Sequence, residues 1–443
     1  MDSKKKVLML GWEFPPVING GLGVACFGIA KALSTHVDLN LIIPKSDEDT
    51  FLDNVNIIGV NQLEAVTLFE EEIVMHQLEK SQLKKELELS ITTTSNFVDP
   101  YYQYESNEFI DKEKTSFDIL IQDIFGLQSV PKEFVNIFKD SNVYGEDVIQ
   151  KVILYSKFVE KISEDLDFDT IYAHDWMTFL AGVQLKHKTA KPLVLHVHAL
   201  DYDRVGPDSH GWIFDLEKYA MQHADKIIPV SNYTAGIISN HYHIDASKIV
   251  PIHNGAIPIQ PFKEEKSFPE KLVLFLGRVT GQKGPEFFLE VAEKVHKENP
   301  NVRFVVAGAG DKLKRLIENG AYRNIGHRFH FTGFLDKQKV NRLLSMTDVY
   351  CMPSVSEPFG LSALEAAQFD IPVVLSKQSG VSEVLEGALT ADFWDVNLMA
   401  EHIISLLDSK KLVNKLVAKN KENLKDLGWD KSALKINQVF NSL

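Results

Sequence analysis

Short apolar runs alternate with longer amphipathic segments along the chain. The run Lys6–Leu10 predicts a buried strand, because a few consecutive apolar residues bounded by turn residues fit a strand that is covered on both faces. The segment Val24–Leu33 has apolar residues at helical spacing, and the run Val37–Pro44 predicts a second strand. A strand, a helix and a strand in this order are typical of a βαβ unit in a parallel sheet.

The same rhythm continues in two separate stretches. In the first stretch we predict one long helix and then three strands: Asp147–Leu166, Thr170–Ala173, Pro192–Val197 and Lys226–Val230. A polar segment with prolines, Pro258–Pro269, is typical of a linker. In the second stretch we predict alternating strands and helices: Lys271–Leu276, Pro285–Glu298, Val302–Ala307, Lys312–Glu318, His330–Thr332, Lys337–Ser345, Val349–Met352, Leu361–Phe369 and Pro372–Leu375.

This pattern predicts an α/β protein with two Rossmann-like, doubly wound domains that face each other across a cleft. We place the first domain at residues 1–262 and the second at residues 263–427. The remaining residues, 428–443, contain a predicted helix at about Ser432–Asn441 that we expect to cross back to the first domain. Ligands of open parallel sheets bind beyond the carboxyl ends of the strands, so the cleft is the expected site.

Residues from about 60 to 150 interrupt the rhythm, and we interpret them as an insertion in the first domain. The stretch Glu70–Leu89 is rich in charges, with apolar residues at helical spacing. Three tyrosines follow at Tyr101, Tyr102 and Tyr104. They either stack on the sugar rings of an acceptor or belong to a loop without a ligand, and the loop is the simpler interpretation.

The composition and the net charge of the chain argue against some classes of function. The chain has 443 residues, of which 44% are hydrophobic and 24% charged, and its formal net charge is −14. A strongly acidic chain is a poor partner for a phosphate backbone, so we expect no nucleic-acid binding. Cys26 and Cys351 each lie in an apolar run and read as reduced core residues. No apolar run approaches a membrane span or a signal-peptide core, so we expect a cytoplasmic protein without stable membrane insertion.

A glycine turn lies between the first strand and the first helix. Gly20, Gly21 and Gly23 let the backbone approach a ligand closely, and the N–H groups at a helix start favour an anion. A tight turn without any ligand gives the same pattern, so both interpretations stay open.

Two cations lie in the corresponding turn of the second domain. Arg278 and Lys283 come between a strand and a helix that begins at Pro285. Cations before a helix start are unfavourable by roughly 0.3–1 kcal/mol each, which favours a bound anion between them over plain surface charge.

A second set of candidates follows the strand that ends at Met352. Glu357 lies in the loop, and Gly360 and Leu361 open the next helix, where unpaired N–H groups can hold a phosphate. Glu365 lies one turn further along the helix, above Leu361. Glu357 can bind sugar hydroxyls or cap the helix, and Glu365 on its own reads as a buried partner.

Polar residues also end two strands of the first domain. The run His174–Trp176 follows one strand, and His198 follows another. His196 reads as a core histidine, whereas His198 is a candidate for function. The pair Asp201 and Asp203 has metal-ligand spacing, but solvation is the simpler interpretation.

Two other cofactor classes are disfavoured. No cysteine–histidine spacing indicates zinc, and the glycines after Ala307 lack the dinucleotide fingerprint, so we expect neither a metal nor a cofactor.

The combination of motifs resembles the retaining glycosyltransferases of the GT-B fold. The glycine turn, the two cations of the second domain, and Glu357 with Glu365 carry this resemblance. The run His174–Trp176 is similar to the histidine–aspartate–tryptophan segment of the glycogen and starch synthases, and Val197–His198 is similar to their sugar-facing histidine strand. Tyr144–Asp147 before a long helix also looks like part of their inserted region.

The resemblance implies a role for each candidate residue. Gly20 and Gly21, with Gly360 and Leu361, would contact the nucleotide-sugar donor through backbone N–H groups. Arg278 and Lys283 would hold the diphosphate, as catalytic as well as binding residues. Glu357 would bind the hydroxyls of the transferred sugar, and Glu365 the ribose. His198 and Asp175 would line the sugar and acceptor side. No metal would be needed, because cations and helix ends replace it.

The reaction that this implies is transfer of glucose from ADP- or UDP-glucose to an α-1,4-glucan with retention. The bacterial ADP-glucose synthases have a lysine before the glycines, whereas here the run is Val17–Gly21, and Phe359 stands where some synthases have cysteine. Three alternatives therefore stay open: another acceptor (a small sugar, a sugar phosphate or a lipid), a sugar-nucleotide epimerase, or a binding protein without catalysis. The oligomeric state is not readable from the sequence.

Overall fold

The computed structural model describes residues 4–17, 20–63, 121, 124–126, 136–140, 142–145 and 147–443. The predicted helical stretch Glu70–Leu89 and the tyrosines Tyr101, Tyr102 and Tyr104 lie outside the described residues, as does most of the predicted insertion.

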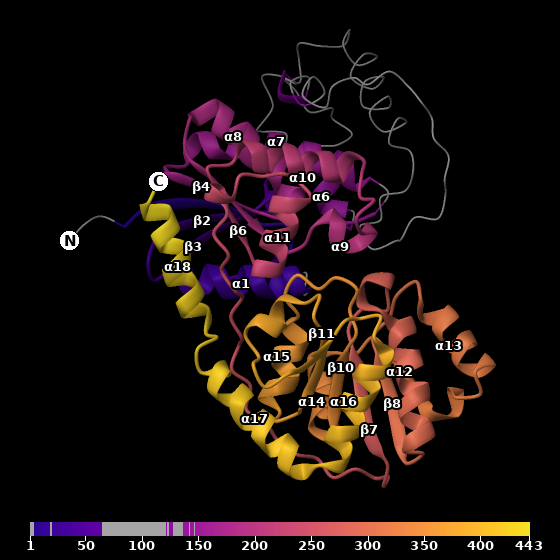
Figure 1. Cartoon of the computed structure of the whole chain (residues 1–443). Coiled ribbons are helices and arrows are strands. Elements are labelled where there is room, and N and C mark those ends of the chain that lie inside the picture. The colour runs from indigo at the N-terminus through magenta and orange to yellow at the C-terminus, as the bar shows by residue number, and fades with distance from the viewer. Residues whose placement is uncertain are drawn as a thin grey trace.

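Two parallel sheets of six strands each form the centres of the two halves of the molecule (Figure 1). The first sheet contains β1 (Lys6–Leu10), β2 (Asp38–Ile43), β3 (Val55–Gly59), β4 (Thr170–His174), β5 (Leu193–Val197) and β6 (Lys226–Pro229). The second contains β7 (Lys271–Leu276), β8 (Val302–Ala307), β9 (Phe329–Gly333), β10 (Val349–Met352), β11 (Val373–Ser376) and β12 (Leu389–Ala391). The predicted α/β fold with two doubly wound domains is confirmed. β3 and β12, which the sequence pattern did not predict, are edge strands.

The two sheets have the same strand order. The first runs β3-β2-β1-β4-β5-β6, and the second, read from its other edge, runs β9-β8-β7-β10-β11-β12. In each sheet the order reverses next to its first strand, between β1 and β4 in one and between β7 and β10 in the other. The loops that leave these strand pairs diverge to opposite faces, which makes this the point where open α/β sheets bind ligands.

Both faces of each sheet are buried. In β1 the alternating residues Leu8 and Leu10 belong to one core cluster, and Val7 and Met9 belong to another. The strands of the second sheet divide in the same way between two further clusters. Burial on both faces explains why the strands read as continuous apolar runs.

Helices cover both faces of both sheets (Figure 1). Those of the first half are α1 (Gly21–Leu33), α6 (Ile137–Asp140), α7 (Val148–Ile162), α8 (Trp176–Thr189), α9 (Asp201–Val205), α10 (Trp212–His223) and α11 (Asn232–Asn240). Those that follow are α12 (Pro285–Glu298), α13 (Leu313–Tyr322), α14 (Lys337–Met346), α15 (Leu361–Gln368), α16 (Val396–Asp408), α17 (Lys410–Leu424) and α18 (Trp429–Asn441).

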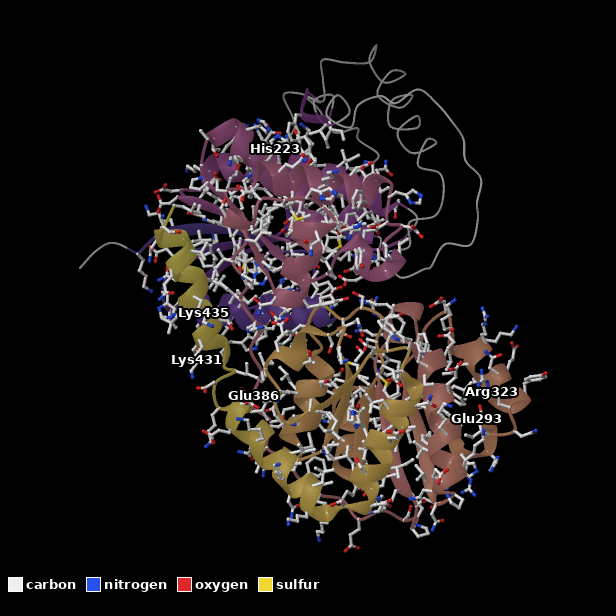
Figure 2. All side chains as sticks on the ribbon, in the orientation of Figure 1. His223, Glu293, Arg323, Glu386, Lys431 and Lys435 are labelled. Carbon is white, nitrogen blue, oxygen red and sulfur yellow. The ribbon has the colours of Figure 1, made fainter. Side chains whose placement is uncertain are left out.

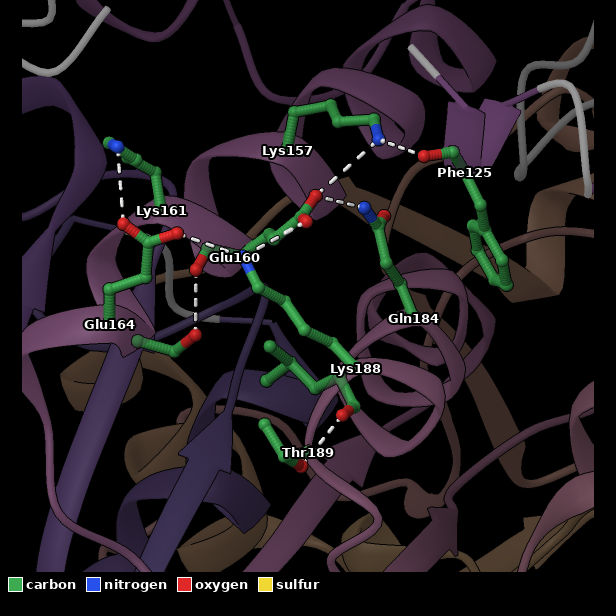
Figure 3. A network of polar contacts seen from close by, with 10 residues as sticks. Phe125, Lys157, Glu160, Lys161, Glu164, Gln184, Lys188 and Thr189 are labelled. Carbon is green, nitrogen blue, oxygen red and sulfur yellow. Dashed lines mark hydrogen bonds and ion pairs between the residues drawn. The ribbon is translucent and has the colours of Figure 1, made fainter. Parts of the chain in front are cut away.

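A polar network joins α7 to α8 along their length (Figure 3). Glu160 accepts hydrogen bonds from Gln184 and from Lys188, the latter at 3.2 Å. Lys188 also donates to Glu164 at 2.8 Å. These contacts lie at the rim of an otherwise apolar helix pair, so they fix its register while the buried side chains supply most of its stability.

The last helix, α18, packs against α1 of the first half (Figure 1). Ala433, Ile436 and Phe440 lie in the same core cluster as Cys26. The fit is close, because a Cβ added at Gly28 would lie 2.5 Å from the Trp429 ring. The C-terminal segment is therefore part of the first core.

The outer surface carries many charged pairs. Figure 2 shows Glu293 and Arg323 at the surface of the second half, where they form an ion pair at 3.0 Å. Within the part of the chain that the structure describes, no helix has the length and apolar character that a membrane crossing requires.

Candidate functional site

The loops that follow β7 and β10 lie against each other. The N–H of Val355 donates to the carbonyl of Gln282 at 2.9 Å. Gly284, at φ +65°, approaches the same loop so closely that an added Cβ would lie 2.1 Å from the carbonyl oxygen of Pro353. The strand order thus brings together two loops that are about 70 residues apart, as expected at a reversal point.

Lys283 and Glu357 meet where these loops touch. The Lys283 ammonium is ion-paired and hydrogen-bonded to Glu357 Oε2, and Ser354 Oγ donates to the same oxygen at 3.3 Å. The Glu357 side chain is 7% exposed and that of Lys283 is 20% exposed. The pair is therefore largely shielded from water, where electrostatic interactions are stronger than at the surface.

The other candidates of the second domain lie on the loop after β7 and on α15. Arg278 is exposed on the loop after β7. Gly360, at φ +110°, is the N-cap of α15, and Leu361 is its first residue. The N-cap makes no side-chain hydrogen bond to the helix, so the N–H groups at this start are not satisfied by a capping side chain.

Glu365 does not lie alone on α15. It forms an ion pair with Lys337, the first residue of α14. Glu365 is 30% exposed and Lys337 is 58% exposed. Glu365, the predicted ribose contact, is therefore paired with a cation, Lys337, which was not among the candidates from the sequence.

A carboxylate of the protein lies at the start of α1. Glu13 Oε2 accepts a hydrogen bond from the N–H of Gly23 at 3.0 Å, and the Tyr144 hydroxyl donates to Glu13 Oε1. An added Cβ at Gly20 would lie 2.1 Å from Glu13 Oε2. An acidic side chain suits the positive end of the helix dipole. A phosphate at Gly20 and Gly21 would therefore come close to an anion of the protein.

Asp175 holds the segment that carries His198. Its Oδ1 accepts hydrogen bonds from the N–H groups of His198, at 2.6 Å, and Ala199, at 3.2 Å. Burial raises the pKa of Asp175 to about 7. The residue has φ +59° and ψ 167°, a region that is essentially restricted to glycine, so its backbone is strained.

Three imidazoles stack behind this segment. His196 and His198 lie with ring centroids 4.3 Å apart, and His174 Nδ1 lies 3.0 Å from His198 Nε2. His196 is buried against Tyr172 as a core histidine. Burial lowers the pKa of His198 to about 3 and that of His174 well below its ordinary value, so both rings are neutral at physiological pH.

The two halves are joined by polar contacts next to these residues. Asp203 Oδ1 accepts a hydrogen bond from Ser356, the neighbour of Glu357, and the Tyr233 hydroxyl lies 2.9 Å from the same Ser356 Oγ. Burial raises the pKa of Asp203 to about 6. The Asp203 carboxylate is thus engaged with the protein, and the interpretation of Asp201 and Asp203 as solvated residues is wrong, because both are buried.

Further contacts run from the start of α11 to the second half. Glu383 accepts hydrogen bonds from the N–H groups of Asn232, at 2.9 Å, and Tyr233, at 2.7 Å. Ser231 Oγ donates to the carbonyl of Pro358 at 2.6 Å. The loop that carries Glu357 is therefore anchored to the first domain on its far side as well.

The sequence analysis missed the contact partners of its own candidates. Glu13 was visible as an acidic residue ten positions before Gly23, and an acidic residue near a helix start is a capping signal. Ser356, Lys337 and Cys26 had no comparable signal, because their partners come from distant segments.

Family models match the chain in tandem. A model described as "Glycosyltransferase Family 4" matches residues 128–258, and a model described as "Glycosyl transferases group 1" matches residues 257–423. The border between the two matches falls just before β7, between the two sheets.

Individual proteins are similar to the chain over much of its length. An uncharacterized glycosyltransferase of Methanocaldococcus jannaschii is 31% identical over 236 residues, which cover 49% of this chain and 60% of that protein. A glycogen synthase of Mycobacterium tuberculosis is 26% identical over 287 residues, which cover 61% of this chain and 68% of that protein. The alignments thus span about two thirds or less of these relatives' own length.

Solved structures share the whole architecture. A sucrose-phosphate synthase from Thermosynechococcus elongatus superposes with a TM-score of 0.68, covering 99% of both chains at 16% identity. Anabaena HepE in complex with UDP-glucose superposes with a TM-score of 0.62, covering 99% of this chain and 100% of that one at 15% identity. At such identities the likeness concerns the fold.

Proposed function

The chain belongs to the glycosyltransferases of the GT-B fold, and from this premise we propose that it transfers glucose from a nucleoside-diphosphate glucose to a sugar acceptor with retention of configuration. The observation that carries the proposal is the meeting of Lys283 and Glu357 at the reversal point of the second sheet. A shielded cation and a shielded carboxylate side by side can serve the two parts of such a donor.

The diphosphate is the part that needs positive charge. We propose that Lys283 turns from Glu357 to the phosphates when the donor binds, and that Arg278 joins it from the preceding part of the loop. The N–H groups of Gly360 and Leu361 add a helix start that suits an anion. These groups stabilise the negative charge that grows on the leaving diphosphate, and they do so in a partly dry site where such contacts are strongest.

The sugar and the ribose are neutral and carry hydroxyls. Once Lys283 has turned away, the Glu357 carboxylate is free to accept hydrogen bonds from the hydroxyls of the transferred sugar. Glu365 takes the ribose hydroxyls in the same way. Gly20 and Gly21 let the first domain approach the donor closely, and a side chain at Gly20 would also meet Glu13.

The acceptor enters from the first domain in this proposal. Neutral His198 and the Asp175 carboxyl group line its side of the site. The bond between the sugar C1 and the diphosphate oxygen breaks, and the acceptor oxygen forms a bond to C1 on the same face. The acceptor proton passes to the leaving phosphate oxygen, so the protein needs to supply no base of its own.

An α-1,4-glucan is the acceptor that we propose first. The likeness to a glycogen synthase over 61% of the chain supports it, together with the histidine–aspartate–tryptophan segment. Because the run Val17–Gly21 lacks the lysine of the bacterial synthases, a small or phosphorylated sugar is the second candidate acceptor.

A two-step assay tests the proposal. Purified protein is first incubated with ADP-, UDP- and GDP-glucose and no acceptor, and then with each donor plus either a glucan primer or a panel of small sugars and sugar phosphates. We expect acceptor-dependent release of the nucleoside diphosphate with retained configuration in the product. Elongation of the primer identifies a glucan synthase.

Other outcomes would contradict the proposal in distinct ways. An epimerised donor formed without acceptor would indicate a sugar-nucleotide epimerase. Donor binding without turnover for any acceptor would indicate a binding protein. Absence of binding for every nucleotide sugar would overturn the donor site itself.

A further inference from the structure

Three metal-binding side chains from separate elements converge inside the first domain. Cys26 comes from α1, His174 from the end of β4 and His198 from the segment after β5. One ligand atom of each lies within 4.8 Å of the other two. Within the residues that the structure describes, this is the one such group of cysteine, histidine and carboxylate side chains. Cys26 and His174 are fully buried, and His198 is partly buried.

We propose that Cys26, His174 and His198 bind a single zinc-type cation. This inference goes beyond the transfer reaction, which requires no ion, and His198 is the one residue that both proposals use.

The distances between the ligand atoms fit such a site. Cys26 Sγ lies 3.6 Å from His174 Nδ1, and His174 Nδ1 lies 3.0 Å from His198 Nε2. Zinc binds sulfur at ~2.3 Å and imidazole nitrogen at ~2.0–2.1 Å, so tetrahedral ligands are separated by roughly 3.5 Å for sulfur and nitrogen and roughly 3.4 Å for two nitrogens. Both observed separations fall within about half an ångström of these values. The third pair, Cys26 and His198, lies within 4.8 Å and needs to shorten by roughly 1.3 Å at most.

Hydrogen bonding alone does not account for the cluster. A neutral imidazole nitrogen carries either one proton or one lone pair, so His174 Nδ1 can satisfy only one of its two neighbours. A cation, in contrast, takes a lone pair from all three ligand atoms at once. The other ring nitrogens, His174 Nε2 and His198 Nδ1, are buried without a hydrogen-bond partner among the described residues, and they would carry the ring protons when the opposite nitrogens bind the cation.

The donor set selects the type of metal. Thiolate and imidazole ligands favour zinc and related borderline cations, whereas magnesium, calcium and manganese prefer oxygen. Binding removes the proton of the Cys26 thiol and releases it to the solvent, which leaves a thiolate–metal bond. Asp175 contributes from outside the cluster, because its hydrogen bonds to the N–H groups of His198 and Ala199 fix the segment that carries one ligand.

Cobalt is the probe for this site, because it replaces zinc and is coloured. The full chain, reduced and freed of metal with a chelator, is titrated with Co²⁺ under anaerobic conditions. We expect one equivalent to produce the intense visible bands of tetrahedral cobalt and a thiolate-to-cobalt charge-transfer band in the near ultraviolet. Added Zn²⁺ should remove both signals by competition.

The chain offers a matched control for each ligand type. Cys351 is also buried, in the second domain, and His196 is a buried histidine of β5 that is not a member of the group. We expect Cys26→Ser to abolish the charge-transfer band and Cys351→Ser to retain it. Loss of an outer partner of a metal ligand typically costs 10–100-fold in affinity, so His174→Gln should weaken Zn²⁺ binding by more than about 100-fold and His196→Gln by much less.

The proposal fails if the folded wild-type chain takes up no stoichiometric Co²⁺, or if the charge-transfer band survives Cys26→Ser or disappears in Cys351→Ser. Circular dichroism of each variant separates loss of the site from loss of the fold. Since the readout is spectroscopic, failure here leaves the proposed transfer reaction standing, and failure of the transfer reaction leaves the metal site standing.

Discussion

The two halves of this protein share one topology, but they differ in the burial and the charge of the side chains near the ends of their strands. Both sheets reverse their strand order next to the first strand, so both place the same two loops at the expected ligand position. In the second half these loops carry the ion pair of Lys283 with Glu357, and helices α14 and α15 carry that of Lys337 with Glu365. In the first half burial makes His198 neutral and raises the pKa values of Asp175 and Asp203.

This difference indicates which half suits the donor and which half suits the acceptor of the proposed reaction. In the proposed reaction the diphosphate meets the cations of the second half, of which Arg278 is exposed to water. The acceptor meets the first half, where burial keeps His198 neutral. The same fold would therefore serve two kinds of ligand because its loops differ in burial, while its strands differ little.

The largest effect is expected in the second half, at the ion pair of Lys283 with Glu357. Lys283→Ala should lower kcat/KM for the nucleotide sugar by roughly 100–1000-fold, equivalent to about 3–4 kcal/mol of transition-state stabilisation, because the leaving diphosphate loses a fixed cation. Initial-rate kinetics measure this. Arg323→Ala removes an equally charged side chain from the surface pair with Glu293 (Figure 2) and should stay within about twofold. A Lys283→Ala enzyme as active as this control would remove the donor site.

In the first half, the raised pKa of Asp203 makes the free energy of unfolding depend on pH. The pKa of Asp203 is raised from 3.8 to about 6 in the folded protein, so the folded state holds the proton more tightly than the unfolded state does. The resulting stabilisation is fully present below about pH 4 and is lost as pH rises through 6, for a total of roughly 3 kcal/mol.

Asp203→Asn has no such titration and serves as the reference. The free energy of unfolding of the wild type, minus that of Asp203→Asn, should fall by roughly 1 kcal/mol between pH 5 and pH 7. Urea titrations at several pH values measure this difference. A difference that is flat or increases with pH would show that burial does not raise the pKa of Asp203.

A third variant pair concerns backbone strain in the first half. Asp175 combines φ +59° with ψ 167°, which costs a residue with a side chain of order 1–3 kcal/mol. Asp175→Gly and Asp175→Ala lose the same two hydrogen bonds, but only glycine relieves the strain. We therefore expect the glycine variant to be more stable than the alanine variant by about 1–3 kcal/mol in urea unfolding. Equal stability of the two would contradict a strained backbone.

The smallest effect is expected at the more exposed pair of the second half. Glu365→Gln should raise the donor KM by roughly threefold to tenfold and leave kcat nearly unchanged, since a ribose contact is made equally in the ground and transition states. Lys337→Ala frees Glu365 from its ion pair and should leave KM unchanged or lower it. If both variants raise KM alike, the pair itself, and not the carboxylate, contributes to binding.

The sequence determined the fold to a large extent, for a local reason. Strands buried on both faces must be continuously apolar and helices that cover them must be amphipathic, so Lys6–Leu10 and Val302–Ala307 were recognisable without any tertiary information. The edge strands Val55–Gly59 and Leu389–Ala391 are partly exposed and short. Their apolar signal was correspondingly weak, and they were missed.

For the candidate site, the sequence indicated the residues but not their contact partners. Loop position, glycine turns and charge before a helix start are local features, and they led to Lys283, Glu357 and His198. The partners of these residues are contacts across the chain: Cys26 meets His174 over 148 positions, and Asp203 meets Ser356 over 153. Burial, and with it the protonation of Asp175, Asp203 and His198, arises only when distant segments pack together and exclude water. The sequence thus determined which groups lie at the ends of the strands, and the tertiary structure alone decided their partners and their charge.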